Sequence, residues 1–139
     1  GKWYRMREYY FDSRKEGRQC TDEEHYTELE KLADGLHISA VIVDPSAASF
    51  IEVIRRHGRF RVEKASNAVI DGIRNVATRL QCGDIFICDC CTDCIREFGM
   101  YRWDEKALMD KPIKENDHSM DDVRYFVHKV FAPELFSFK

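Results

Sequence analysis

One short segment, residues 116–122, brings three carboxylates and an imidazole together in the sequence Asn-Asp-His-Ser-Met-Asp-Asp. Carboxylate oxygens are the ligands that hard divalent cations such as Mg²⁺ prefer. On a helix, Asp121 shares a face with Asp117, four positions before it, and with His118, three positions before it, so the three side chains could converge on one ion. A structural role is also open, since Asp and Asn cap helix N-termini and first-turn acids complement the helix dipole. The segment alone therefore leaves a metal site and a capped helix start as alternatives.

A further candidate is Asp44, which follows the almost wholly apolar, β-branched run Ile38–Val43. Such a run is typical of a short strand buried on both faces of a parallel or mixed sheet. Ligands of open α/β sheets bind at the carboxyl ends of the strands, which is the position of Asp44. The alternative is that Asp44, Pro45 and Ser46 simply turn the chain and cap the next helix.

Together, Asp44 and the acidic segment have the ingredients of a two-metal phosphoryl-transfer site. In such a site the ions lie ~3.5–4 Å apart, one activating water and the other stabilising the leaving oxygen. His118 could move a proton, orient the attacking water or bind metal.

Hydrophobic periodicity predicts an α/β fold that would position these groups. Strands are predicted at Trp3–Phe11, Ile38–Val43, Phe60–Glu63 and Ile85–Cys88. Helices are predicted over about 22–35 after the capping box Thr21–Glu24, from a Ser46 cap to Gly58, from an Asn67 cap to Gly83, around Ile95–Trp103, and as a final helix with Met120, Val123, Val127 and Val130 inward. Gly72 lies inside one helix at a cost of ~1 kcal/mol against Ala, which close packing or a nearby ligand would explain.

The chain has 139 residues, 44% hydrophobic and 34% charged, which predicts one compact domain. Its formal net charge of -3 carries no overall nucleic-acid signature. One basic block could contact phosphates or could be an ordinary solvated helix end and strand; it comprises Arg55, Arg56, His57, Arg59, Arg61 and Lys64. No apolar stretch approaches the ~20 residues that span a bilayer, and the first residues lack a signal-peptide core, so we expect a soluble, cytoplasmic protein.

Six cysteines are present, and four of them crowd between Cys88 and Cys94. Close sequence neighbours pair poorly in disulfides, so reduced thiols in a cytoplasm are expected. Four thiolates could hold zinc, but structural zinc sites usually take two ligand pairs from separated segments. Cys91 and Cys94 also have the spacing of a redox dithiol, which is a weak signal by itself. Ordinary, partly buried cysteines are the preferred interpretation.

Four segments resemble, in the right order, the C-terminal nuclease domain of the large terminase subunits of tailed phages and prophages. They are Val43–Phe50, Asn67–Val76, Tyr101–Lys106 and Lys114–Asp121. The resemblance covers nearly the whole chain, and its most specific motifs are DPSAASF and ENDH-x-MD. It implies a ribonuclease H-like fold, with a mixed sheet flanked by helices. It also implies a Mg²⁺- or Mn²⁺-dependent endonuclease that cuts concatemeric viral DNA when packaging begins and ends.

In that pattern, Asp44 and Asp121 correspond to the metal-binding catalytic acids and His118 to the catalytic histidine, with Asp117 as a secondary ligand. The complete site would hold two ions. Implied partners are double-stranded DNA, an ATPase domain, a small terminase subunit and a portal, in the bacterial host cytoplasm. The family's further acid, on a strand ahead of Trp3–Phe11, has no counterpart here, and the chain lacks an ATPase phosphate loop. The alternative is an inactive prophage remnant that binds DNA through the arginines and the lysine of the basic block.

Overall fold

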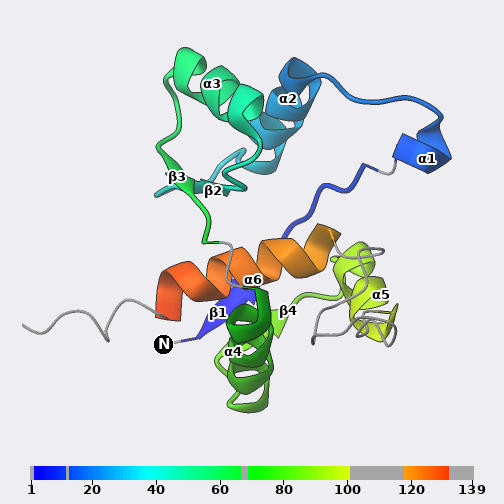
Figure 1. The fold of residues 1–139 in the computed structure, drawn as a ribbon, viewed down its shortest axis with the longest axis vertical. Helices are drawn as coiled ribbons and strands as arrows, with labels where there is room; N and C mark the ends of the chain where they lie inside the picture. Colours follow the sequence, from blue (N-terminus) through cyan, green and yellow to red (C-terminus); the bar gives the residue numbers. More distant parts are fainter. Residues whose placement is uncertain (1, 12, 67–68, 101–117, 132–139) are drawn as a thin grey trace, which may run out of the picture. The chain divides into compact units, whose positions relative to one another are not determined.

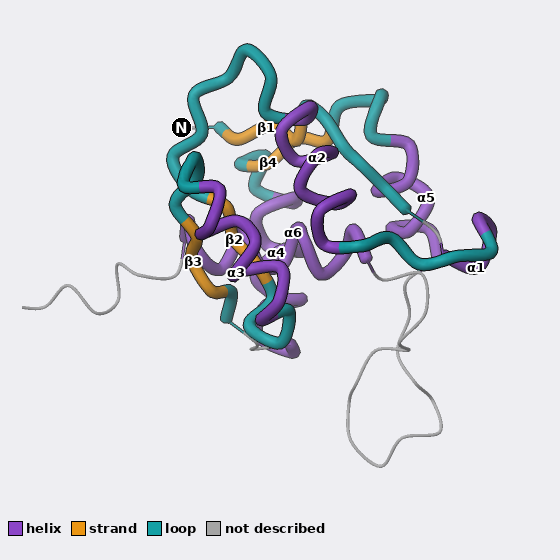
Figure 2. The backbone as a smooth tube through the Cα atoms, turned by 90° about the horizontal axis from the view of Figure 1, so that it is seen from above, coloured by secondary structure: helices purple, strands orange, loops and turns teal. Residues whose placement is uncertain are grey.

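The computed structural model describes residues 2–11, 13–66, 69–100 and 118–131, and it divides into two compact units (Figure 1). Unit 1 comprises residues 1–6 and 66–139, and unit 2 comprises residues 7–65. Within the described residues each unit has a two-stranded parallel sheet, β1 with β4 in unit 1 and β2 with β3 in unit 2 (Figure 2). The predicted α/β class is confirmed as short parallel sheets flanked by helices, and the single domain stays a prediction.

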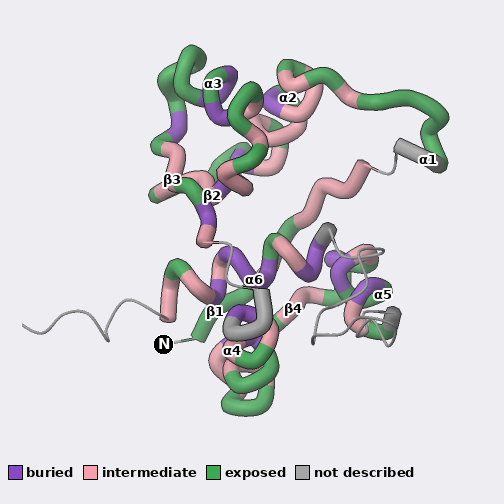
Figure 3. The backbone as a smooth tube through the Cα atoms, in the orientation of Figure 1, coloured by how far each residue is buried: buried purple, intermediate pink, exposed green. Residues whose placement is uncertain are grey.

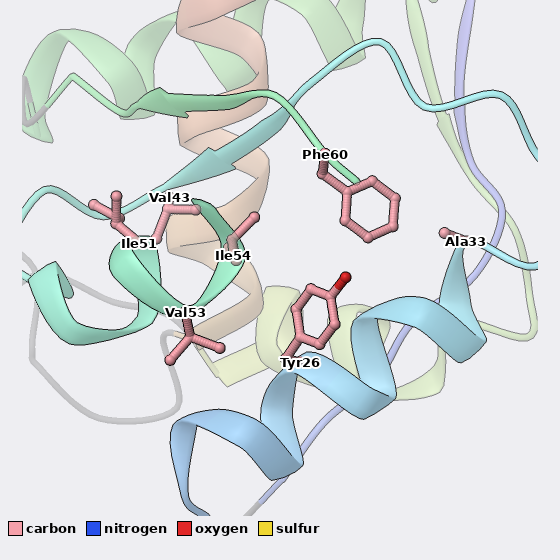
Figure 4. Close-up of a cluster of buried hydrophobic side chains, with 7 residues drawn as sticks. All are labelled: Tyr26, Ala33, Val43, Ile51, Val53, Ile54 and Phe60. Carbon is pink, nitrogen blue, oxygen red and sulfur yellow. The ribbon is translucent and has the colours of Figure 1, made fainter. Parts of the chain in front are cut away.

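Unit 2 is held together by an apolar core between two helices and the strands. Its elements are α1 (Ser13–Glu16), α2 (Asp22–Leu32), β2 (Val41–Val43), α3 (Ala48–His57) and β3 (Val62–Lys64). The core side chains are Tyr26, Ala33, Val43, Ile51, Val53, Ile54 and Phe60 (Figure 4). Full burial stabilises by about 1.5–3 kcal/mol for each large apolar side chain, so this cluster fixes the end of β2 against α3.

The helix ends of unit 2 follow local sequence signals, with one exception. Thr21 Oγ accepts a hydrogen bond from the N–H of Glu24 at 3.1 Å, and the Glu24 carboxylate accepts from the N–H of Thr21 at 3.3 Å. This confirms the predicted capping box. Gly58 ends α3 with φ of 71°, the left-handed conformation that glycine adopts without strain. The predicted Ser46 cap is wrong, because the residue before α3 is Ala47 and no side chain caps the helix there.

Each of the four strands is shorter in the structure than the sequence predicted. The strand predicted over Trp3–Phe11 ends at Arg5, and those predicted over Ile38–Val43 and Ile85–Cys88 are reduced to Val41–Val43 and Ile85–Ile87. The strand predicted over Phe60–Glu63 is shifted to Val62–Lys64. The reason is partner length, because β1 pairs with only three residues of β4, from Trp3 opposite Ile85 to Arg5 opposite Ile87. Apolar residues beyond the paired stretch serve as core side chains, as Phe60 does in unit 2. Backbone pairing, rather than apolar content, decides where each strand stops.

Unit 1 packs three helices beside its sheet. Its elements are β1 (Trp3–Arg5), α4 (Val69–Gln81), β4 (Ile85–Ile87), α5 (Thr92–Met100) and α6 (His118–Phe131). The predicted inward face of the final helix is confirmed for Met120, Val123 and Val127, which are buried. Figure 3 shows buried stretches along α6. Asn67 and Trp103, named in two predicted helix boundaries, lie outside the described residues. Across the described residues, every helix is too short or too polar to span a bilayer.

Gly72 in α4 is explained by close packing against α6. A Cβ atom at this position would lie 2.4 Å from Cγ and 2.6 Å from Cδ of Arg124. Real Cβ atoms do not approach other heavy atoms so closely, so the stem of Arg124 occupies the volume that a side chain at residue 72 would need. The close-packing explanation predicted from the sequence is confirmed.

Candidate functional site

Asp44 lies directly after the last residue of β2, the carboxyl end of the strand where the sequence placed it. Its Oδ1 accepts hydrogen bonds from both the N–H and the Oγ of Ser46, each at 2.9 Å. Its backbone carbonyl accepts from the N–H of Ala47 at 3.0 Å. These bonds form a turn that leads from β2 into α3. The predicted turn is therefore confirmed, and Ser46 stabilises Asp44 rather than capping the helix.

Asp121 lies in the first turn of α6, which begins at His118. Its side chain is 23% exposed, and its Oδ1 accepts a hydrogen bond from Arg124 Nη2 at 3.0 Å. The side chain of His118 and the whole of Asp117 fall outside the described residues. The backbone is helical from His118 onward, as the predicted spacing requires. The roles of His118 and Asp117 stay predictions.

Glu97 of α5 caps the start of α6, a role that the sequence did not predict. The residue is completely buried, and its Oε1 accepts hydrogen bonds from the N–H groups of Ser119 at 2.7 Å and Met120 at 3.2 Å. These are the second and third amides of the helix, the two that a capping side chain at Asp117 would accept. A carboxylate at a helix N-terminus is also favoured by the helix dipole. Capping of this helix therefore reaches across from another helix.

Arg124 is the second residue that sequence reasoning missed. It is 3% exposed, and its guanidinium lies 4.9 Å from the centre of the Tyr125 ring. Within the described residues its Nε and Nη1 are buried without a hydrogen-bond partner, whereas Nη2 bonds Asp121. Its spacing of three residues from Asp121 was the available signal, because such pairs meet on a helix surface. No local sequence pattern could have predicted that Arg124 is buried against Gly72, because the two residues lie on different helices.

The two candidate acids belong to different units, Asp44 to unit 2 and Asp121 to unit 1. Their convergence on one metal stays a prediction. Among the residues that the structure describes, no three or more His, Cys, Asp or Glu side chains are grouped so as to hold a metal ion. The donor chemistry fits Mg²⁺ or Mn²⁺ all the same, because both acids offer hard carboxylate oxygens.

The basic block is partly neutralised by acids of unit 2. Arg59 pairs with Glu30 at 3.2 Å, Arg61 pairs with Glu63, and His57 Nε2 lies 3.0 Å from a carboxylate oxygen of Glu23. Stacking on Tyr26, with ring centres 3.8 Å apart, also holds His57. The exposed side chains of the block that have no acid paired with them in these contacts are Arg55, Arg56 and Lys64. Of the five positive residues predicted to contact DNA, Arg55, Arg56 and Lys64 are therefore the strongest candidates.

The cysteines between 88 and 94 tie the start of α5 to the end of β1. Cys90 Sγ donates to the carbonyl of Met6 at 3.0 Å, and Cys91 Sγ donates to the carbonyl of Arg5 at 3.4 Å. Cys91 and Cys94 are completely buried, whereas Cys90 is exposed. All six cysteines lie within the described residues, and they are thiols rather than disulfides. These contacts fit the interpretation as ordinary cysteines, and they add that Cys90 and Cys91 help to pack α5 against the end of β1.

Comparison with known proteins adds a strong relationship. No protein-family model matches the chain. The large terminase subunit of Escherichia phage T5 is 25% identical over 116 residues, which are 79% of this chain and 26% of that protein. A structure of the large terminase from a thermophilic bacteriophage is 48% identical with a TM-score of 0.88, over 94% of this chain and 34% of that one. The same terminase in complex with ADP gives 49% identity and a TM-score of 0.90, with the same coverage.

The chain thus spans about a quarter of the phage T5 protein and about a third of the thermophilic phage's terminase. Nearly half of the aligned residues are identical to those of the thermophilic phage's terminase, and the backbone agrees over almost the whole chain. Agreement of sequence and fold over the same residues excludes a chance likeness of architecture. Over nearly its whole length, the chain is therefore similar in sequence and in fold to part of the large terminase subunits of phages.

Proposed function

We propose that this chain acts in phage DNA packaging as a divalent-metal-dependent endonuclease that cuts concatemeric viral DNA. The observation that carries the proposal is the position of Asp44 at the carboxyl end of β2 in a chain related to large terminases. Asp121 supports it, because this second carboxylate lies in the first turn of α6, within the segment that resembles the terminase nuclease motif. Large terminases have an ATPase domain and a nuclease domain. We propose the nuclease activity because the sequence segments of this chain resemble the nuclease domain.

In the proposed reaction, Asp44 would bind metal at the end of β2, and Asp121 would bind metal in the first turn of α6, with Asp117 as a further candidate ligand. When bound, Mg²⁺ or Mn²⁺ supplies an activated water and neutralises the charge of the leaving oxygen. The turn at Ser46 orients the Asp44 carboxylate, and Arg124 orients that of Asp121. His118 holds or moves the proton of the attacking water through its imidazole.

DNA is the proposed substrate, and its phosphates would meet exposed basic side chains. Arg55 and Arg56 lie in the last turn of α3, and Lys64 ends β3. Basic residues also complement a helix C-terminus, so their position alone does not require DNA. As a packaging protein, the chain would work with a terminase ATPase domain, a small terminase subunit and a portal.

The test is cutting of supercoiled DNA in Mn²⁺ by the wild-type chain and by Asp44→Asn. Asparagine retains an oxygen that accepts the two Ser46 hydrogen bonds, so the turn survives while the metal-binding charge is lost. We expect cutting to fall more than about 100-fold, because even the outer partners of a metal ligand are worth about 10–100-fold. Asp34→Asn, at an exposed acid of the same unit, is the matched control and should cut normally. Equal cutting by Asp44→Asn and wild type would remove Asp44 from the mechanism.

A DNA-binding chain without nuclease activity is the second candidate, favoured by the exposed Arg55 and Arg56. It predicts DNA binding that weakens steeply with salt, because each phosphate contact releases a counterion. It also predicts no Mn²⁺-dependent cutting by the wild-type chain. The same supercoiled-DNA assay therefore separates the two candidates.

A further inference from the structure

Arg124 is a buried charge whose hydrogen bond goes to a candidate metal ligand. Its side chain is 4% exposed, and its Nη2 donates to Asp121 Oδ1 at 3.0 Å. Its Nε and Nη1 are buried and make no hydrogen bond within the described residues. A charge removed from water in this way is tolerated only where an opposite charge compensates it. The Asp121 carboxylate is that compensating group.

Among the described residues, the groups around Arg124 supply apolar contacts, and Asp121 is the acid that pairs with it. Gly72 of α4 leaves the space in which the Arg124 stem lies, as the 2.4 Å approach of a Cβ to Cγ indicates. Arg124 also lines a cavity of about 240 Å³ whose other walls are apolar, among them Val76, Phe98 and Met120. The guanidinium is therefore held beside Asp121 by the shape of the helix packing.

We propose that Arg124 is a positioning residue that competes with the divalent cation for the Asp121 carboxylate. This proposal rests on the proposed function, in which Asp121 binds metal. A cation at Asp121 must share the carboxylate with the guanidinium or displace it, and the two positive charges repel each other. The same ion pair holds the carboxylate in one orientation, which the reaction requires. Arg124 thereby lowers the affinity for metal and raises the rate of cutting.

Opposite effects on metal affinity and on the rate of cutting distinguish Arg124 from a residue that only stabilises the fold. Loss of a purely structural residue would weaken metal binding and slow cutting together. Loss of the Arg124 charge should instead tighten Mn²⁺ binding by about three- to fivefold, the scale of one partly exposed ion pair. It should slow DNA cutting by about 10- to 100-fold, as loss of a ligand's outer partner does.

The experiment measures Mn²⁺ dissociation constants by calorimetry and electron paramagnetic resonance for the full 139-residue chain. The variants are Arg124→Met, Asp121→Asn and the two combined, with circular dichroism to verify folding. Arg124→Lys retains the charge and should bind Mn²⁺ as the wild type does. Arg74→Met, at an exposed arginine of α4, changes the net charge equally and should leave the affinity unchanged. Arg124→Gln replaces Arg124→Met if the methionine variant does not fold.

We expect Arg124→Met to tighten Mn²⁺ binding and this gain to vanish in the Asp121→Asn background. If Asp121→Asn weakens binding but Arg124→Met does not tighten it, the Arg124 proposal is wrong and the metal assignment stands. If Arg74→Met tightens binding as much, the effect is one of net charge and the proposal is likewise overturned. If Asp121→Asn leaves Mn²⁺ affinity unchanged, the assignment of Asp121 fails, and the Arg124 proposal fails with it.

Discussion

Replacing Gly72 with alanine should destabilise unit 1 in the wild type and stabilise it once Arg124 is also alanine. In a helix, alanine is favoured over glycine by about 1 kcal/mol. Against this, the new Cβ would lie 2.4 and 2.6 Å from two stem atoms of Arg124. Overpacking of this kind typically costs about 1–3 kcal/mol, and the shortness of both distances places it at about 2–3. The net loss expected in the wild type is about 1–2 kcal/mol.

In the Arg124→Ala background the obstructing atoms are gone, so Gly72→Ala should gain about 1 kcal/mol from helix propensity alone. The coupling between residues 72 and 124 is then about 2–3 kcal/mol, within the range for residues in contact. Urea unfolding followed by tryptophan fluorescence measures it, since Trp3 belongs to unit 1.

Gly99→Ala in α5 is the matched control, because a Cβ there meets nothing within 4 Å. It should stabilise in both backgrounds by up to about 1 kcal/mol. The reasoning is refuted if Gly72→Ala behaves like Gly99→Ala in the wild type. It is also refuted if Gly72→Ala has the same effect with and without Arg124.

Three further predictions test the packing of the described helices. Glu97→Ala should lower the free energy of unfolding in urea by about 2–4 kcal/mol, because it leaves two buried N–H groups of α6 without a hydrogen bond. Glu97→Gln can still accept both hydrogen bonds, so its cost should be clearly smaller. Equal costs would refute the cross-helix cap. Gly58→Ala should cost about 1 kcal/mol in thermal or urea unfolding, purely from the φ of 71°, since its Cβ would meet open space; no loss would contradict this. Ellman's reagent should react rapidly with exposed Cys90 and slowly with buried Cys91, so Cys90→Ser but not Cys91→Ser should remove a fast phase.

Local sequence signals predicted the elements whose cause is also local. The capping box at Thr21 needs only residues three apart, and it begins α2 where expected. Gly58 ends α3 because a single residue with positive φ suffices to stop a helix. Helical periodicity also identified the buried face of α6, since Met120 and Val123 lie on one side of any helix built from that sequence.

The strand ends were predicted less well, because a strand is defined by its partner. Trp3–Phe11 has the composition of one long strand, yet only the part paired with β4 is a strand in the structure. Ser46 illustrates the same limit in a turn. Its hydroxyl could cap α3 or bond Asp44, and the backbone geometry of the turn selects Asp44.

For the candidate site, the sequence by itself determined the two carboxylates and their places, Asp44 after a strand and Asp121 at a helix start. These follow from the apolar run before Asp44 and from the helical spacing around Asp121, both of which the sequence carries locally. Only the tertiary structure decided what holds the start of α6. Glu97 lies 22 residues before Ser119, and Arg124 meets Gly72 from a different helix. Such contacts exist only after packing brings distant segments together, since burial and hydrogen bonding across helices leave no mark on local periodicity.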